Sequence, residues 1–440
     1  MDFHGDTTFS ATQSKVSIPR DLMVTKCATD LFSFIARQIE TFLRTFHGDC
    51  FTPSEHQPVF SLGLTFSYPV DQTAIGSGIL LRWTKGFDIP NVVGRDVCQL
   101  LQHEIDSLHL PVRVTALVND AAGTIMSGAY TLPVSQTRTS IGAIFGTGTN
   151  AVYLEKLSRI TKPLDRQYDR STGEMLVSIE WGSFDNDLSV LPNTPYDVQL
   201  NQVSVNPGNQ MFEKRVSGMF LGELLRDVTL AMHTDPAIKL FHDTSSNPAP
   251  VDDGSPLHVP WAVDSSILSV AEADGSDELA ILRQKIADYL AVPAATVGVE
   301  DAQAVKLIAH AIGKRAARLA GMAIGAVVLQ SERLVDLVDP PIAGTETLPS
   351  RRSLSQESSS GAVPLGGDLP NALDEHGIVD IAVDGSLIEF YPGFETYMRE
   401  VLRAVEGIGA AGEKRIRMGI AKDGSSVGAA IIALLAARQA

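Results

Sequence analysis

Cysteine is scarce in this 440-residue sequence, and so are closely spaced metal ligands. The three cysteines, Cys27, Cys50 and Cys98, are odd in number and show no CxxC spacing. This pattern excludes a disulfide scaffold and a cysteine-based zinc site, and it favours a reducing compartment. The ten histidines form no HxxxH or HExxH pair, so the sequence predicts no protein-ligated metal.

Long apolar runs are also missing. The longest, Val427–Ala437, is too short to span a bilayer. The first residues, Met1–Asp6, have neither the basic nor the apolar stretch of a secretory signal. We therefore expect a soluble cytoplasmic protein that is not inserted in a membrane.

Basic residues are outnumbered by acidic ones. The chain has 35 Lys and Arg against 52 Asp and Glu, a formal net charge of −17. Such a balance argues against binding to nucleic acid or to an anionic membrane, because both reward a basic face. It does not exclude a phosphate-bearing ligand, which needs only a local cluster of donors. At 44% hydrophobic residues the chain can bury a large core, and its length allows roughly two to three domains.

Apolar periodicity alternates between strand-like and helix-like segments, which predicts an α/β architecture. Helices are expected over 26–47, 96–107, 212–232, 277–290 and 301–330, and strands over 16–19, 61–70, 111–118, 139–145 and 378–383. Residues 339–370 have a low-complexity sequence with few large apolar side chains, and we expect a disordered insertion there.

Polar clusters follow several of the predicted strands. Ligands of α/β proteins bind where the carboxyl ends of strands meet the next helix or turn. Asn119 and Asp120 occupy such a position, although an isolated strand followed by Asn-Asp is more typical of an ordinary helix cap at Asp120. The turn 146–148 could approach a phosphate closely, or it could be a plain hairpin turn. Gly424 and Ser425 open the last predicted helix, where small residues suit either an anion or simple capping.

Taken in order, these segments and several others resemble the hexokinase signature and catalytic segments, and the resemblance is closest to fungal hexokinases. The resemblance covers nearly the whole chain and is strongest over 61–235. It is carried by LGLTFSYP (62–69), RWTKGF (82–87), LVND (117–120), IFGTGTN (144–150), EWGSFD (180–185) and PGNQMFEK (207–214).

The resemblance implies a two-lobed, actin-like ATPase fold of the ribonuclease H type. The implied parts are a small lobe over 1–118, a large lobe over 119–425, and a C-terminal helix over 426–440 that returns toward the small lobe. It also implies phosphorylation of a hexose such as glucose at its 6-hydroxyl by ATP with Mg²⁺, in a monomer or homodimer. Asp120 would be the general base.

The resemblance also assigns two groups of binding residues. Those expected to bind the sugar are Ser67, Thr84, Lys85, Asn119, Asn150, Glu180 and Glu213. Together they provide the donors and acceptors that a ring of sugar hydroxyls requires. Those expected to bind the nucleotide are Gly146, Thr147, Gly148, Gly424 and Ser425. From local spacing alone, either glutamate could instead be a surface carboxylate.

This sequence departs from the family mainly on the phosphate side. Hexokinases carry an early Asp-Leu-Gly-Gly-Thr-Asn run that wraps the transferring phosphates, and it is absent here. We therefore expect an N-terminally shortened chain with an incomplete small lobe and an exposed sheet edge. Smaller departures at Ala121, Lys314 and Lys422 also fall on the nucleotide side.

Two alternatives to an active kinase follow from these departures. The chain could be a catalytically weak or inactive sugar-binding regulator, because preorganised phosphate donors are lost. Such a regulator could reside at the mitochondrial surface or in the nucleus. Alternatively, the printed sequence could begin at a downstream methionine of a longer product.

Overall fold

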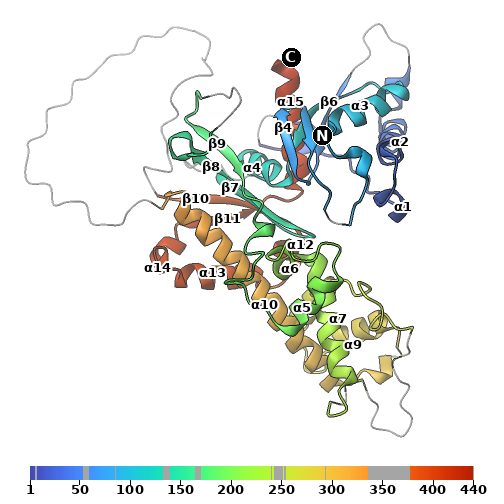
Figure 1. The fold of residues 1–440 in the computed structure, drawn as a ribbon, viewed down its shortest axis with the longest axis vertical. Helices are drawn as coiled ribbons and strands as arrows, with labels where there is room; N and C mark the ends of the chain where they lie inside the picture. Colours follow the sequence, from blue (N-terminus) through green and yellow to red (C-terminus); the bar gives the residue numbers. More distant parts are fainter. Residues whose placement is uncertain are drawn as a thin grey trace, which may run out of the picture.

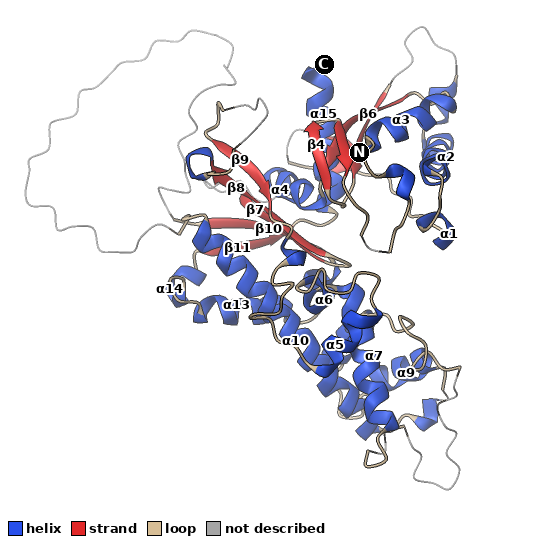
Figure 2. Cartoon of the chain, in the orientation of Figure 1, coloured by secondary structure: helices blue, strands red, loops and turns tan. Residues whose placement is uncertain are grey.

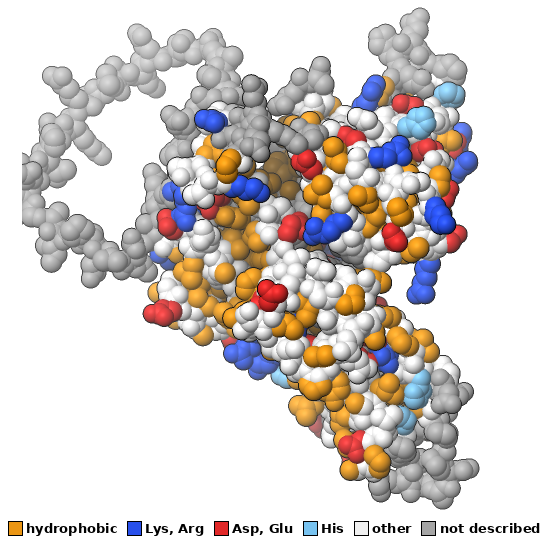
Figure 3. Space-filling view, in the orientation of Figure 1, with side chains coloured by type: hydrophobic (Ala, Val, Ile, Leu, Met, Phe, Trp, Pro, Cys, Tyr) orange, Lys and Arg blue, Asp and Glu red, His pale blue; other side chains and the backbone are white. Residues whose placement is uncertain are grey.

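The computed structural model describes residues 1–4, 7–52, 59–84, 86–131, 139–163, 170–238, 240, 241, 251, 254–292, 294–334 and 377–439. Lys85 and the expected insertion 339–370 lie outside the described residues. Within them the chain is mixed α/β, with one five-stranded sheet and, in the N-terminal part, three two-stranded sheets (Figures 1 and 2). On the face drawn in Figure 3, Lys and Arg side chains are interspersed with Asp and Glu side chains.

The five-stranded sheet positions most of the polar segments noted in the sequence. Its strand order is β11 (Ile416–Ile420), β10 (Val379–Asp384), β7 (Thr139–Phe145), β8 (Thr149–Lys156) and β9 (Glu174–Ser178). Strand β10 is parallel to both β7 and β11, whereas β7, β8 and β9 pair antiparallel. Every residue of β7 is buried, as expected of a strand covered on both faces. The carboxyl ends of β7, β10 and β11 therefore meet at one edge.

Helices pack on this sheet and extend beyond it, with the long helix α10 running along them (Figure 1). Most of them contribute buried residues to one hydrophobic core that they share with the sheet. Small residues allow close approach along α10: a Cβ on Gly321 would lie 2.6 Å from the carbonyl oxygen of Met398. The helices are α5 (Pro195–Val203), α6 (Glu213–Val216), α7 (Gly218–Thr234), α8 (Ser266–Ala273), α9 (Ala280–Leu290), α10 (Val299–Gln330), α12 (Ser386–Phe390), α13 (Phe394–Ala404) and α14 (Gly409–Glu413).

The N-terminal part of the chain builds a second, smaller core. Strand β3 (Phe60–Thr65) pairs in parallel with β6 (Val112–Val118). Strands β4 (Val70–Ala74) and β5 (Ser77–Leu80) form an antiparallel hairpin. This hairpin adjoins β6, because Leu117 N–H donates to the carbonyl oxygen of Ile75 at 2.7 Å. Helices α2 (Ala28–Phe46) and α3 (Val97–Ser107) pack together here. The other elements of this part are β1 (Asp2–Phe3), β2 (Phe9–Ser10) and α1 (Arg20–Met23). Among the described residues, β6 is the one strand hydrogen-bonded to β3.

Two helices lie between the five-stranded sheet and the sheet of β3 and β6, and they touch backbone to backbone. Helix α4 (Asp120–Thr131) packs against β7, and α15 (Gly424–Gln439) packs against β3, β6 and α4. A Cβ on Gly428 of α15 would lie only 1.9 Å from the carbonyl oxygen of Gly123 in α4. The start of α4 is therefore held directly by α15. The lobe boundaries at 118/119 and 425/426 remain a proposal.

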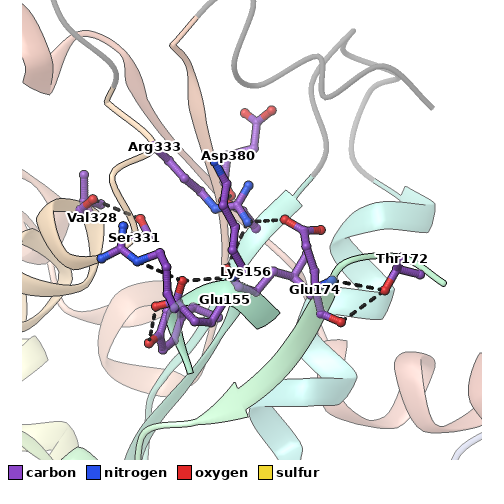
Figure 4. A network of polar contacts seen from close by, with 12 residues as sticks. Glu155, Lys156, Thr172, Glu174, Val328, Ser331, Arg333 and Asp380 are labelled. Carbon is purple, nitrogen blue, oxygen red and sulfur yellow. Dashed lines mark hydrogen bonds and ion pairs between the residues drawn. The ribbon is translucent and has the colours of Figure 1, made fainter. Parts of the chain in front are cut away.

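Buried polar contacts join the C-terminal end of α10 to strands β8 and β9 (Figure 4). Arg333, only 3% exposed, donates to the carbonyl oxygen of Leu154 at 2.9 Å and to Glu174 Oε1 at 2.7 Å. Such a buried pair is costly to break, because the remaining charge is left without its partner. Arg333 therefore fixes this end of the long helix on the sheet.

Most of the predicted elements are confirmed, and three predictions were wrong in detail. No strand forms at 16–19, and Val16 is 52% exposed there. The expected strand 61–70 is interrupted at 66–69, where Pro69 has no N–H to donate, and its two ends belong to separate strands, β3 and β4. The expected helix 212–232 breaks at Ser217, which is extended (φ −91°, ψ 148°). The N–H of the next residue, Gly218, bonds instead to the carbonyl oxygen of Gly146 at 2.8 Å.

Candidate functional site

A small polar pocket lies at the junction of α4, the five-stranded sheet and the N-terminal part of the chain. Six of the seven residues expected to bind the sugar line it, together with the expected base, Asp120. The seventh, Lys85, lies outside the described residues. The full lining is Ser67, Pro69, Thr84, Asn119, Asp120, Thr149, Asn150, Glu180, Gly182, Gln210 and Glu213.

Asn119 and Asp120 reach the pocket because β6 runs straight into α4. The carbonyl oxygen of Asn119 accepts the first intrahelical bond, from Gly123 N–H at 2.9 Å, and its side-chain Oδ1 accepts from Ala121 N–H at 3.0 Å. Asn119 therefore occupies the N-cap position, and Asp120 Oδ1 accepts the same Ala121 N–H at 2.8 Å. Asp120 occupies the first helical position, where the positive end of the helix dipole favours its carboxylate.

Glu180 is held at the pocket by two polar neighbours. Its Oε1 accepts from Asn150 Nδ2 and from Ser178 Oγ, each at 2.8 Å. Asn150 also accepts the backbone N–H of Glu180 at 3.0 Å, so the two residues bond reciprocally. The backbone of Glu180 is left-handed (φ 53°), a conformation that costs free energy in a residue other than glycine and recurs at binding sites.

Glu213, the other glutamate of the pocket, is only 6% exposed. Its Oε1 accepts the backbone N–H of Thr149 at 3.2 Å, and its Oε2 accepts from Gln210 Nε2 at 3.0 Å. The Thr149 hydroxyl in turn accepts from Trp181 Nε1 at 3.0 Å. A buried carboxylate with these partners is fixed in place before any ligand arrives.

The expected nucleotide-binding residues lie at the edge of the five-stranded sheet where the carboxyl ends of β7, β10 and β11 meet. The turn 146–148 follows β7, and a Cβ on Gly146 would lie 3.3 Å from the Cα of Gly385, which follows β10. Gly424 and Ser425 begin α15, after β11, and Asp384 Oδ2 accepts the backbone N–H of Ser425 at 3.3 Å. Burial raises the pKa of the Asp384 carboxyl. All five expected residues thus lie at or beside one edge.

Sequence reasoning missed four residues of the pocket: Pro69, Thr149, Gly182 and Gln210. Gln210 lies three residues before Glu213, in a segment that carries the family resemblance, but nothing local distinguishes it from a surface amide. Its position is stabilised by contacts from distant parts of the chain, and its backbone is left-handed (φ 55°).

Two further findings bear on partners and metals. Over the described ranges, no helix is long and apolar enough to cross a membrane. Among the same residues, no group of three or more His, Cys, Asp or Glu side chains is placed to hold a metal ion.

Comparison with known proteins agrees with this architecture. Two family models, both described as hexokinase, match residues 1–130 and 140–435. The chain is 47% identical to a glucokinase of Aspergillus niger, covering 100% of this chain and 83% of that relative. It is 39% identical to glucokinase-1 of Saccharomyces cerevisiae, covering 99% and 81%.

A solved structure is similar over almost the whole fold. A hexokinase from Schistosoma mansoni complexed with glucose matches with a TM-score of 0.69 at 28% identity, covering 95% of this chain and 78% of that one. The fold is that of a two-lobed, actin-like α/β phosphotransferase. Within that class the chain belongs to the hexokinase family, and it is a hexokinase-type enzyme.

Proposed function

We propose that this chain transfers the γ-phosphoryl group of ATP to the 6-hydroxyl of a hexose such as glucose, with Asp120 as general base. The observation that carries the proposal is the convergence of Asp120, Asn119 and two glutamates on one pocket. A hexose presents hydroxyl groups that need both donors and acceptors, and this set supplies both. The names of the relatives, glucokinase and hexokinase, and the glucose-bound relative support glucose as the sugar.

In this proposal each wall of the pocket has a separate task. Glu180 and Glu213 accept hydrogen bonds from sugar hydroxyls and orient the ring, while Asn119 and Asn150 donate to it. Asp120 accepts the proton of the 6-hydroxyl as that oxygen attacks phosphorus. We further propose that the reaction takes place in the cytoplasm.

The glycine-rich edge fits the phosphate chain of a nucleotide. Helix α15 directs its N-terminal N–H groups toward this edge, and the exposed residue Thr147 offers a hydroxyl donor. Bound ATP with Mg²⁺ would supply the phosphoryl group and the positive charge that stabilises its transfer. The residues that would hold its phosphates are those of the turn 146–148 with Gly424 and Ser425.

A second candidate function is sugar binding with weak or no phosphoryl transfer. It is favoured by the departures from the family at Ala121, Lys314 and Lys422, which fall on the nucleotide side. Measuring glucose binding by calorimetry and glucose 6-phosphate formation by a coupled assay separates the two. Binding with turnover supports the kinase; binding without turnover supports the regulator; no binding contradicts both.

Removing either glutamate is expected to weaken glucose binding. Glu213→Ala should weaken glucose binding by about 3 kcal/mol, because the sugar loses a buried carboxylate that Thr149 N–H and the Gln210 amide hold in place. Glu180→Ala should weaken glucose binding by about 1 kcal/mol, because Glu180 is exposed and water can take the place of its carboxylate as the hydrogen-bond partner of the sugar. Calorimetric titration with glucose measures both.

The control for this pair is Glu278→Ala, which removes an exposed carboxylate far from the pocket lining. It should leave glucose affinity unchanged. If both pocket variants bind glucose as tightly as the wild type does, these two residues do not bind the sugar.

A further inference from the structure

A hydroxyl outside the pocket lining links the two turns that carry the pocket glutamates. Ser183 ends the short 3₁₀ helix 181–183, which directly follows Glu180. The Ser183 hydroxyl donates to Gln210 Oε1. Gln210 Nε2 donates onward to Glu213 Oε2 at 3.0 Å. A continuous chain of hydrogen bonds therefore runs from the Glu180 turn to the Glu213 carboxylate.

The surroundings leave the Gln210 amide a single productive orientation. With the amide reversed, its carbonyl oxygen would face the Glu213 carboxylate, and two acceptors would oppose each other. The close contact with Gly182 also limits its movement, since a Cβ there would lie 2.9 Å from Gln210 Nε2. Ser183 satisfies the carbonyl end of the amide, and this leaves the amide nitrogen aimed at Glu213.

The backbone conformation of both turns indicates that surrounding contacts hold Glu180 and Gln210 in place. Glu180 and Gln210 both have left-handed backbones, with φ of 53° and 55°. Non-glycine residues keep such a conformation only where the surrounding contacts over-determine it. The bond between Ser183 and Gln210 is a side-chain tether that joins the two strained turns, 27 residues apart in sequence.

We propose that Ser183 is a positioning residue that sets the spacing and orientation of the two pocket carboxylates by holding Gln210 against Glu213. The proposal rests on the proposed function, because it takes glucose as the ligand of the pocket. Ser183 does not line the pocket and acts only through Gln210. Its effect therefore falls on sugar affinity.

The first test is calorimetric titration of the full chain with glucose. Ser183→Ala is expected to raise the Kd about three- to tenfold, the loss that accompanies one neutral hydrogen bond. Ser183→Thr keeps the hydroxyl and should restore the affinity to within about twofold of the wild-type value. Ser189→Ala, at an exposed serine of the following loop, is the matched control and should leave the Kd unchanged.

A double-mutant cycle separates positioning from a general loosening of the site. If Ser183 acts through Gln210, the double variant S183A/Q210A should bind glucose no more weakly than Q210A alone. A general structural defect would instead multiply the two losses and lower the thermal midpoint of S183A. Multiplied losses, or a Kd for S183A within twofold of wild type, overturn the proposal. Absence of glucose binding by the wild-type chain would overturn the proposed function, and this proposal with it.

Discussion

Asp120→Asn is expected to lower kcat for glucose phosphorylation by about 100- to 10,000-fold while leaving glucose affinity within severalfold of the wild-type value. The asparagine amide is nearly isosteric with the carboxyl group and can still accept the N–H of Ala121, which Asp120 Oδ1 accepts at 2.8 Å. It cannot take a proton from the attacking hydroxyl. The substitution should therefore slow the chemical step, and a coupled assay at saturating glucose and ATP measures the decrease in kcat.

The control for Asp120→Asn is Asp277→Asn, the same change at an exposed aspartate away from the pocket. It should retain full activity. Two outcomes would contradict the base assignment: an Asp120→Asn variant with kcat near the wild-type value, or one that loses glucose binding and phosphorylation in equal proportion. If the wild type binds glucose but shows no turnover, the sugar-binding alternative replaces the kinase.

The sequence predicted the positions of pocket residues best where the signal is local. An apolar strand that runs into a polar pair shows where the strand ends, and this pattern placed Asn119 and Asp120 at a strand end, as a helix cap or as site residues. The same reasoning located the turn 146–148 after β7. These predictions depend only on residues that are adjacent in the chain, so the packing of helices against the sheet does not alter them.

Contacts between distant segments could not be predicted in this way. Glu213 meets the N–H of Thr149, 64 residues earlier, and nothing near either residue signals that they meet. The break at Ser217 has the same origin, because a bond from Gly218 to the turn after β7 overrides a continuous helical pattern. At Asp120 the sequence left open both a helix cap and a site residue; in the structure Asp120 lines the pocket and its Oδ1 also accepts the N–H of Ala121.

The position of the proposed base depends on a contact between two helices. Asp120 begins α4, and α4 is held by α15, which also packs on β3 and β6. The contact is tight enough to exclude any side chain: a Cβ on Gly428 would lie 1.9 Å from Gly123 O and 2.5 Å from Gly123 Cα. Both neighbouring atoms are backbone, so they cannot rotate away as a side chain would. A side chain at this position must push the two helices apart.

Gly428→Val is therefore expected to lower the free energy of unfolding by about 3 kcal/mol or more, at the upper end of the cost of overpacking. It should also lower kcat, because separating the helices displaces Asp120 from the sugar pocket, and small displacements of a catalytic group are costly. Denaturant unfolding measures the first effect, and the coupled assay the second. Gly275→Val is the matched control: a Cβ there meets no atom within 4 Å, so its stability should change by less than about 1 kcal/mol. Equal stabilities for the two variants would show that α4 and α15 can move apart freely and that this contact does not position the base.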